Sequence, residues 1–394
     1  MNAPAHVPAE LIYEFDYLTD TALLTDPHQR FAELGARFPG GIFYSTANGG
    51  HWVLTSYERF CAAARTPEIF SSNKVNIPPT EQPFLLIPIN IDPPEHGHYR
   101  AAIAPAFAPA KMRTMEPAIE ELSRELITAV APDGHCEFVS AVAEPLPISI
   151  FMRWVGLPLE RRLEFRDWAV TALTSTEPPV RMENMLKITE FMSEVIEERR
   201  QHPGDDIISS LFSAEIDGRP LKTEEIQAYC LLFFLAGLDT VVNAMSFGAR
   251  HLATDHDLQA RIRNNPDIVP AVVEEALRRY SFVNTARVVT RDYDFDGIQL
   301  AEGDMVMLSE AAADLDPNAF ENPQDFILDR KGPRHVAFNT GPHACLGAHL
   351  ARIELTIAYR TLCQTLPAFS LCPDRPAVFT GGSVMGLREL HLIW

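Results

Sequence analysis

One cysteine lies in a segment that restricts how this chain can fold. Cys345 follows the run Phe338-Asn339-Thr340-Gly341-Pro342-His343-Ala344 and precedes Leu346-Gly347. Because apolar residues recur at helical spacing after it, we expect an irregular loop that leads into a helix, with the Cys345 sulfur at the helix N-terminus. Free N–H groups and the positive end of the helix dipole favour a thiolate there. Gly341 and Gly347 let the backbone turn sharply and approach a flat ligand closely. The apolar stripe of the helix is Leu346, Leu350, Ile353, Ile357 and Ala358.

The charge balance argues against one broad class of partner. The chain has 394 residues, with 33 Lys and Arg against 53 Asp and Glu, and so a formal net charge of −20. Because affinity for nucleic acid comes mainly from clustered basic residues, we expect no nucleic acid partner. With 46% hydrophobic and 22% charged residues, the composition is that of a globular protein with a large core. Length alone suggests two or three domains.

The sequence predicts no membrane segment and no export signal. The longest apolar run, Ala228 to Leu238, has 11 residues, whereas about 20 are needed to cross a bilayer. The N-terminal segment has neither a basic region nor an apolar stretch of the kind that marks secretion. The six cysteines form no CxxC pair and no zinc spacing, which is typical of a reducing compartment. We therefore expect a cytoplasmic protein without a membrane partner.

Periodicity predicts a mainly helical chain with smaller β portions. Helical spacing runs through about residues 100–280 and again through 346–362. About 40–56, about 286–308 and the C-terminus are expected to be β-rich. One helix is predicted from Ile226 to Leu252, with Thr223 as its cap. Other helices are predicted at Met115 to Val130, Leu186 to Ile196 and Ile268 to Tyr280. The irregular stretch 309–345 is long enough to indicate a function.

Two polar residues interrupt the apolar helix predicted over Ile226 to Leu252. Asp239 and Thr240 follow Ala236 and Gly237 directly. A charge and a hydroxyl in an apolar helix are costly to bury unless they have partners or a function. Taken alone, the pair also fits a surface aspartate beside a threonine that bends the helix.

These segments together resemble the cytochrome P-450 family. Phe338 to Gly347 fits F-x-x-G-x-H/R-x-C-x-G, the haem-binding loop of that family. Ala236 to Thr240 is similar to its oxygen-activation motif, and Glu275-Ala276-Leu277-Arg278 to its E-x-x-R motif. The chain resembles soluble bacterial class I members, and the match to the camphor hydroxylase branch is closer still. That closer match lies in Ala236–Asn243 and Glu274–Ser281.

The resemblance implies a fold, a cofactor and an activity. The fold would be mainly α with a small β region, as a single triangular domain over residues 1–394, because the motifs from Asp92 to Gly347 interleave around one cofactor. The cofactor would be haem b with the Cys345 thiolate as the axial ligand to iron, which favours O–O cleavage. The activity would be that of a monooxygenase. It would use O2 and electrons from NAD(P)H, passed through a flavoprotein reductase and a 2Fe–2S ferredoxin.

The resemblance also assigns roles to individual residues. Asp239 and Thr240 would deliver protons during oxygen activation, and Gly237 would leave room for the oxygen ligand. Glu275, Arg278 and Arg330 would form a buried ion-pair cluster that holds the segment before the cysteine loop. The haem propionates would be bound by His96, Arg100, Arg287 and His343. The remaining haem contacts would come from Ala236, Gly237, Phe338, Gly341 and Gly347.

The substrate is predicted to be a hydrophobic small molecule. In the camphor hydroxylase a tyrosine at the position of Phe84 donates a hydrogen bond to the ketone. Phenylalanine has no donor, and losing such a buried bond costs about 1 kcal/mol or more. We therefore expect a terpenoid or an ionone-like norisoprenoid, with camphor or a related monoterpene as the alternative. The candidate pocket residues, each of which also fits ordinary core packing, are Phe84, Ile87, Ile89, Leu232, Leu235, Ala236, Val283 and Val384.

Other function classes make different demands on the same residues. A peroxide-using or dehydrating family member is expected to lack the pair Asp239 and Thr240. A non-catalytic haem sensor would need Cys345 but not that pair. A hydrolase built on Cys345 and His343 would need no haem, and a structural cysteine would leave the glycines around it unexplained.

An electron-donor ferredoxin is usually acidic, and so is this chain. Docking therefore requires a local basic patch on the cysteine side. The candidates, apart from any that a propionate or Glu275 engages, are Arg100, Arg330, Lys331, Arg334, Arg352 and Arg360.

Overall fold

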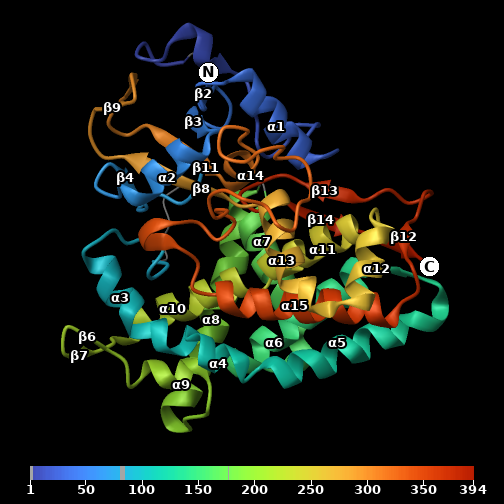
Figure 1. Ribbon diagram of the computed structural model, residues 1–394. Coiled ribbons are helices and arrows are strands. Elements are labelled where there is room, and N and C mark those ends of the chain that lie inside the picture. The colour runs from blue at the N-terminus through green and yellow to red at the C-terminus, as the bar shows by residue number, and fades with distance from the viewer. Residues whose placement is uncertain (1–2, 80–84, 176) are drawn as a thin grey trace.

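The computed structural model describes residues 3–79, 85–175 and 177–394 and places a β-rich portion against a larger helical body (Figure 1). The helices are α1 Pro27–Arg37, α2 Tyr57–Arg65, α3 Glu95–Ile103, α4 Pro109–Arg113, α5 Glu116–Val130, α6 Pro145–Val155, α7 Arg162–Thr174, α8 Pro178–Gln201, α9 Ile207–Leu211, α10 Thr223–Gly237, α11 Thr240–Leu252, α12 His256–Asn264, α13 Val269–Arg279, α14 Glu310–Asp314 and α15 Ala348–Thr365. The strands are β1 Ile12–Tyr13, β2 Ile42–Ser45, β3 His51–Leu54, β4 Phe70–Ser71, β5 His135–Glu137, β6 Glu215–Ile216, β7 Arg219–Pro220, β8 Asn284–Val289, β9 Tyr293–Phe295, β10 Ile298–Leu300, β11 Met305–Ser309, β12 Ser370–Leu371, β13 Val378–Thr380, β14 Gly386–Glu389 and β15 His391–Ile393.

The predicted fold class, mainly α with a small β region, is confirmed. The β-rich segments expected near 40–56 and 286–308 contain β2, β3 and β8 to β11, and the C-terminal segment contains β12 to β15. The helix expected over 346–362 is α15, which starts two residues later than predicted because the chain makes another turn after Cys345.

The largest sheet holds one residue of the candidate site in a fixed position. Its strand order is β1-β2-β3-β11-β8-β4. Strand β11 runs parallel to β3 and antiparallel to β8, so Val306 pairs with Trp52 on one side and with Arg287 on the other. Strand β8 is thus an interior strand with a fixed register, and its Arg287 side chain is buried.

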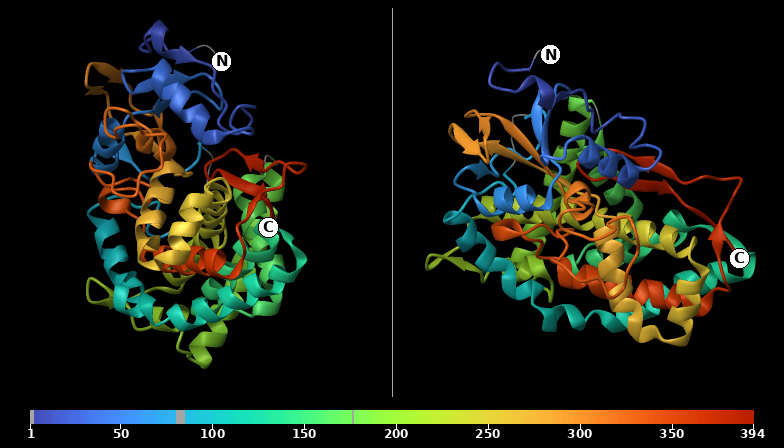
Figure 2. Two further views of the ribbon diagram at one scale, coloured as in Figure 1. Left: turned by 45° about the vertical axis from the view of Figure 1, so that its right-hand side comes forward. Right: turned by 45° about the horizontal axis from the view of Figure 1, so that its top comes forward.

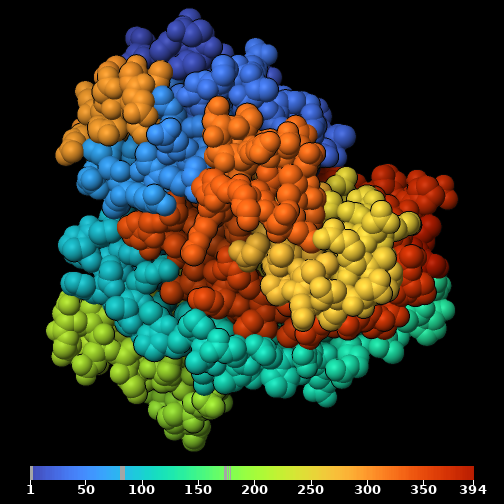
Figure 3. All heavy atoms as spheres, viewed as in Figure 1, coloured from blue at the N-terminus to red at the C-terminus, as the bar shows by residue number. Residues whose placement is uncertain are grey.

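The helical body is built around α15. This helix packs against α5, α11, α12 and α13, and α5 runs alongside it at the base of the molecule in both views of Figure 2. Its inward face carries fully buried Leu355, Tyr359 and Leu362, which is why the apolar stripe predicts the helix correctly. The irregular segment before it, orange in Figure 3, covers the middle of one face between the β-rich portion and the helices.

The single helix predicted from Ile226 to Leu252 is two helices. The first, α10, ends at Gly237, and α11 begins at Thr240, with Leu238 and Asp239 between them. The expected cap is also wrong, because Thr223 is the first helical residue and Lys222 is the N-cap. The Glu225 carboxylate accepts the free Lys222 N–H at 2.7 Å, so an acid in the first turn does what the threonine hydroxyl was expected to do.

The segment Thr223–Leu252 is, among the described residues, the one stretch long and apolar enough to cross a membrane by length and composition. This segment was not found from the sequence, because only uninterrupted apolar residues were counted and that run stops at Asp239. The mean hydropathy of a longer window stays high across Asp239. Within the fold 67% of that window is buried, as in the core helix of a globular protein.

Candidate functional site

The cysteine loop turns back on itself before the helix starts. The Cys345 N–H donates to the Phe338 carbonyl at 2.8 Å, and Asn339 and Gly341 adopt positive φ of 57° and 71°. The N–H groups of Gly347 and Ala348 point toward the Cys345 sulfur. Cys345 therefore lies one turn before the first residue of α15 rather than within its first turn.

The expected lowering of the Cys345 pKa is not what the protein alone produces. Burial raises the pKa of the thiol, whereas the N–H groups of Gly347 and Ala348 and the Arg100 guanidinium lower it. Desolvation is the larger effect because the sulfur lies deep in the protein, although its residue has an accessible surface. A bound metal cation reverses this balance, because a coordinating thiol is deprotonated outright.

Of the two glycines in the loop, the backbone geometry requires glycine only at Gly341. Gly341 has a positive φ, and a Cβ there would clash with the Ala64 carbonyl oxygen at the end of α2. The chain turns at Gly347 as predicted, but the backbone there is right-handed helical with φ of −74°, which does not require glycine. A Cβ at Gly347 would lie in ordinary contact with the Cys345 sulfur at 3.8 Å.

The structure brings together the four residues assigned to the propionates. The His96 and His343 rings are 4.2 Å apart, and the Nε2 atom of each is buried without a partner. Arg287 is 5% exposed, and its one described hydrogen bond goes to the Ala286 carbonyl at 2.7 Å. Arg100 donates to the Ala344 carbonyl of the loop. No described carboxylate forms an ion pair with either arginine, so the cluster has room for an anion.

Mutual repulsion and burial shift the pKa values of this cluster. The His343 pKa falls to about 3 because the ring is buried, with further lowering by Arg287, His96 and Arg100. Burial lowers the Arg287 pKa to about 10, and Asp92 opposes that shift. The Asp92 carboxylate already accepts from the Ser71 hydroxyl and from the Ser72 N–H, so it leaves the cationic cluster largely uncompensated.

Asp239 and Thr240 stand at the break between α10 and α11. The Thr240 hydroxyl donates to the Ala236 carbonyl at 3.1 Å, and the Asp239 Oδ2 atom accepts from Asn243 at 2.9 Å. The Asp239 Oδ1 atom lies 4.0 Å from the Arg166 guanidinium on α7. Burial raises the pKa of Asp239, and Arg166, Asn243 and Arg388 lower it.

Gly237 has a different steric role from the one predicted. A Cβ there would lie 2.8 Å from Cζ of Phe151 and closer still to two other atoms of that ring. The glycine thus allows α10 to pack against the buried Phe151 of α6. Ala236, the residue before it, is exposed.

The candidate pocket residues come from four parts of the chain. Val283 and Val384 pair directly in an isolated antiparallel β-bridge. Leu235 of α10 is buried and Leu232 is half-buried. Ile87 is fully buried, whereas Ile89 is 38% exposed. Phe84 lies outside the described residues.

The three charged residues of the predicted cluster meet in the core. Arg278 and Glu275 share two hydrogen bonds of 2.8 and 2.9 Å, and Arg330 donates to Glu275 at 3.0 Å. Arg278 also donates to the carbonyls of Asp314, Pro323 and Asp325. The cluster therefore ties α13 to the irregular segment that precedes the cysteine loop.

Comparison with known proteins identifies the family. The family model described as cytochrome P-450 matches residues 174–378. The chain is 33% identical, over 99% of its length, to a probable cytochrome P-450 127A1 of Sinorhizobium fredii (strain NBRC 101917 / NGR234), and the match covers 96% of that relative. The chain belongs to the cytochrome P-450 family. A steroid C26-monooxygenase of Mycolicibacterium smegmatis is 34% identical over 84% of this chain and 85% of that protein.

Solved structures of cytochromes P-450 match the whole chain. That of CYP101J2 has a TM-score of 0.91 and 34% identity, covering 100% of this chain and 99% of that one. That of CYP101C1 has a TM-score of 0.90 and 32% identity, with full coverage of both chains. These matches confirm the resemblance to bacterial class I enzymes, the monooxygenase class and a haem cofactor held by a cysteine thiolate.

The residues of this cytochrome P-450 fit haem. The two unpartnered histidine nitrogens, with Arg100 and Arg287, which pair with no carboxylate among the described residues, supply donors for the two propionates. Cys345 lies beside this cluster, close enough to interact electrostatically with Arg100, and has an accessible surface. An aromatic residue of the loop, Phe338, lies under the Arg352 guanidinium at 4.6 Å, which fixes the orientation of its ring.

Three residues that the sequence argument missed belong to this part of the cytochrome P-450. Arg166 and Glu144 lie beside Asp239, and the one available signal was that a buried aspartate needs a cationic partner. Asp314, next to Arg278, accepts from the Ser281 hydroxyl at 2.6 Å and from the Val336 N–H at 2.8 Å. Its burial is the signal, and a sequence does not show that.

Proposed function

We propose that this cytochrome P-450 hydroxylates a hydrophobic terpenoid or ionone-like norisoprenoid, with electrons from a 2Fe–2S ferredoxin. The proposed substrate class rests on the chemistry of the side chains that are predicted to form the pocket wall, here called the candidate wall. Val283 and Val384, which pair with each other, and Leu232, Leu235 and Ile87 are all aliphatic. A wall without a side-chain donor binds through apolar contact and selects by shape.

The proposed chemistry divides between the cofactor and the chain. Haem bound through a thiolate supplies the activation of dioxygen and the transfer of one oxygen atom. Cys345 would be its axial ligand, and His96, Arg100, Arg287 and His343 would bind its propionates. Asp239 would take protons from solvent, and the Thr240 hydroxyl, held by the Ala236 carbonyl, would pass them on. The candidate wall residues would exclude water and hold the C–H bond of the substrate in place.

Spectral titration of the purified holoprotein tests the substrate class. We expect β-ionone to shift the haem absorption as a bound substrate does, with a Kd at least about tenfold below that for camphor, because tighter apolar burial adds more than about 1.4 kcal/mol. Product analysis by mass spectrometry should then show one added oxygen. A tighter response to camphor would make the monoterpene alternative correct, and no response to either compound would contradict the proposal.

The structure narrows the predicted docking patch for ferredoxin. Arg352 and Arg360 pair with Glu274 at 2.5 Å and Glu120 at 2.7 Å, and Arg330 pairs with Glu275. Lys331 and Arg334 are exposed. Helix α4 packs against α15 and carries the exposed Arg113. We place the basic docking surface on Arg113, Lys331 and Arg334. The enzyme would work in the cytoplasm, where a soluble ferredoxin can reach this surface.

Charge reversal at Arg113 tests this surface. R113E should raise the apparent KM for an acidic 2Fe–2S ferredoxin about tenfold at low salt and much less at high salt, because an exposed charge acts mainly on association. The exposed Arg291 between β8 and β9 offers a matched control, so R291E should leave this KM unchanged. Equal effects of the two variants would place the donor elsewhere.

A further inference from the structure

Arg166 lies between two carboxylates and favours one of them. Its Nη2 atom is 2.8 Å from Oε1 of Glu144 and 4.0 Å from Oδ1 of Asp239. The three side chains are largely buried, with exposed fractions of 23% for Arg166, 15% for Glu144 and 18% for Asp239. Because the attraction between opposite charges weakens with distance, Arg166 compensates the charge of Glu144 more strongly than that of Asp239.

The backbone around Glu144 has an unusual form. Residues Val139–Ala143 form a π-helical turn, and the Glu144 N–H closes it by donating to the Val139 carbonyl at 2.8 Å. Pro145 then begins α6. The π turn packs against α11 and β14. Such turns are rare, occur often at functional sites, and here place one acidic side chain beside the break between α10 and α11.

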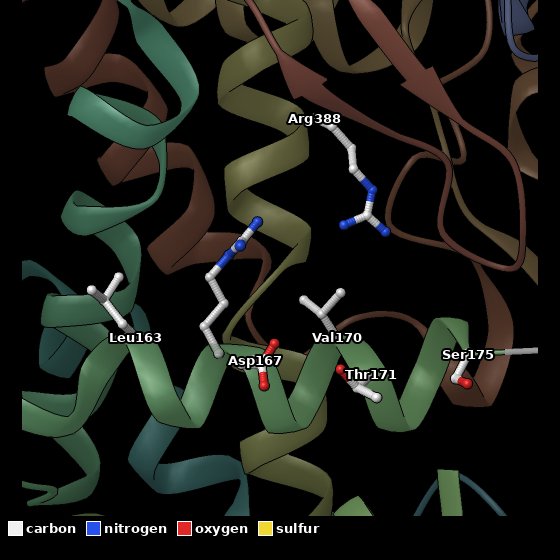
Figure 4. A pocket seen from close by; sticks show the side chains of 7 residues that line it. Leu163, Asp167, Val170, Thr171, Ser175 and Arg388 are labelled. Atoms are coloured by element: carbon white, nitrogen blue, oxygen red, sulfur yellow. The ribbon is translucent and has the colours of Figure 1, made fainter. Parts of the chain in front are cut away.

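The solvent side of this cluster is a hollow of about 310 Å³. Arg166 of α7 and Arg388 of β14 both line this hollow. Figure 4 shows Arg388 above the helix that carries Asp167, Val170 and Thr171. The buried Nε atom of Arg166 has no partner, so this guanidinium is not fully satisfied where it lies. Asp239 is not part of the lining of the hollow, but its Oδ1 atom lies 4.0 Å from Arg166, which is.

We propose that Glu144 is a positioning residue that holds Arg166 away from Asp239 and so keeps the Asp239 carboxyl free to take up and release a proton. This inference rests on the proposed role of Asp239. A proton would leave water in the hollow, bind a carboxylate oxygen of Asp239 and depart toward the Thr240 hydroxyl, which regenerates the carboxylate. If Arg166 closed onto Asp239, the carboxylate would be held in its charged form and would not carry the proton.

Burial and the neighbouring side chains shift the pKa of Asp239 in opposite directions. Burial raises the pKa of Asp239, whereas Arg166, Asn243 and Arg388 lower it. Burial also raises the pKa of Glu144, Arg166 and Arg388 lower it, and Glu137 and Asp239 raise it. Removing the charge of Glu144 would take a neighbouring negative charge from Asp239 and release Arg166 toward it. Both changes lower the Asp239 pKa.

The decisive measurement is the titration of Asp239 in the holoprotein by infrared spectroscopy, with the carboxyl band assigned by its loss in D239N. In E144Q the band of the protonated acid should appear at lower pH than in the wild type, and each pKa unit lowers the protonated fraction at neutral pH about tenfold. Coupled product formation should fall with it and recover at lower pH. In E144Q/R166M the Asp239 titration and the coupling should both recover, because the competing cation is gone.

Controls separate this role from simple damage to the fold. Glu164 also lies on α7 and pairs at the surface with Arg161 at 2.8 Å, so E164Q should leave the Asp239 titration unchanged. An unshifted Asp239 band in E144Q, or a failure of R166M to reverse the shift, would overturn the positioning role. Unchanged coupling in D239N would instead overturn the proposed function of Asp239. The two failures can be told apart, because the shift of the Asp239 band in E144Q is measured independently of turnover.

Discussion

At the scale of single residues, burial acts against ionisation throughout the site, and a few partners oppose it. Asp239 has a raised pKa because it is buried, although Arg166 and Asn243 lower it. Thr240 keeps its hydroxyl in place by donating to Ala236 across the helix break. Burial thus disfavours the charged form of Asp239, and the proposed proton delivery through Thr240 is a matter for experiment.

Thr240 offers a direct test of proton delivery. T240A removes the hydroxyl and one short hydrogen bond at a half-buried position, so the fold should lose only about 1 kcal/mol. We expect NAD(P)H consumption to continue while product falls and peroxide rises, measured together in one assay. T240S keeps the hydroxyl and should restore coupling. A T240A enzyme that stays coupled would contradict the assigned role.

Asp314 is a second buried acid, and its raised pKa contributes to the dependence of stability on pH. Burial raises the Asp314 pKa from 3.8 to about 6. Between these values the folded chain keeps a proton that the unfolded chain has lost, so stability falls as pH rises through this window and stays lower above it. Asparagine would keep both hydrogen bonds, because its oxygen can accept the Val336 N–H and its amide can donate to Ser281.

Replacing Asp314 should therefore stabilise the protein at alkaline pH. We expect D314N to be more stable than the wild type at pH 8, by at most about 3 kcal/mol, and no more stable at pH 4. Guanidinium unfolding of both holoproteins between pH 4 and pH 8 measures the difference in their free energies of unfolding. The neighbouring Glu310 titrates in both proteins, so its contribution largely cancels in this difference. A difference independent of pH would show that Asp314 is not the titrating group.

At the scale of elements, the break between α10 and α11 places the acid and the hydroxyl beside each other. It depends on packing: Gly237 lies against the Phe151 ring of α6, and Leu238 is fully buried. The π turn before α6 adds Glu144 to the same place. The π turn before α6 and the break between α10 and α11 thus lie close to each other, and Asp239 is part of that break.

The packing at Gly237 is testable by adding one methyl group. G237A would push a Cβ to within 3 Å of the Phe151 ring, so we expect a loss of about 1–3 kcal/mol in the free energy of unfolding. Gly35 in α1 has nothing within 4 Å of an added Cβ, and G35A should stabilise the protein by about 0.5–1 kcal/mol. If G237A is as stable as the wild type, the Phe151 ring can move aside.

At the scale of the whole molecule, a buried ion cluster connects the helical body to the cysteine loop. Glu275 and Arg278 of α13 bind each other, and Arg330 and the backbone of the irregular segment complete the cluster. Glu275 is the shared partner, so its removal would leave two buried guanidinium groups without a carboxylate. The cluster thus holds the long segment 315–338 in the shape that the loop needs.

Removing one charge of this cluster should be costly. E275Q leaves Arg278 and Arg330 buried without a carboxylate, so we expect a loss of about 3–5 kcal/mol in unfolding free energy and poor haem retention. Glu33 is 51% exposed and 3.8 Å from Arg30, and E33Q should cost less than about 1 kcal/mol. The absorbance of bound haem, followed during denaturant titration of each variant, reports both the free energy of unfolding and the retention of haem. Similar losses in the two variants would mean that the cluster is not important for stability.

The sequence by itself determined the family, the haem-thiolate chemistry and the fold class of this protein. These depend on close spacing, since Phe338, Gly341, His343 and Cys345 lie within one loop and apolar periodicity marks α5 and α15 directly. The tertiary structure alone decided that α10 and α11 are separate, that Gly237 faces Phe151, and that Arg352 and Arg360 are held by acids. The tertiary structure alone also brings Glu144, Arg166 and Asp239 together, although they are far apart in the chain. Local spacing carries no information about such contacts, because they form only when distant helices pack.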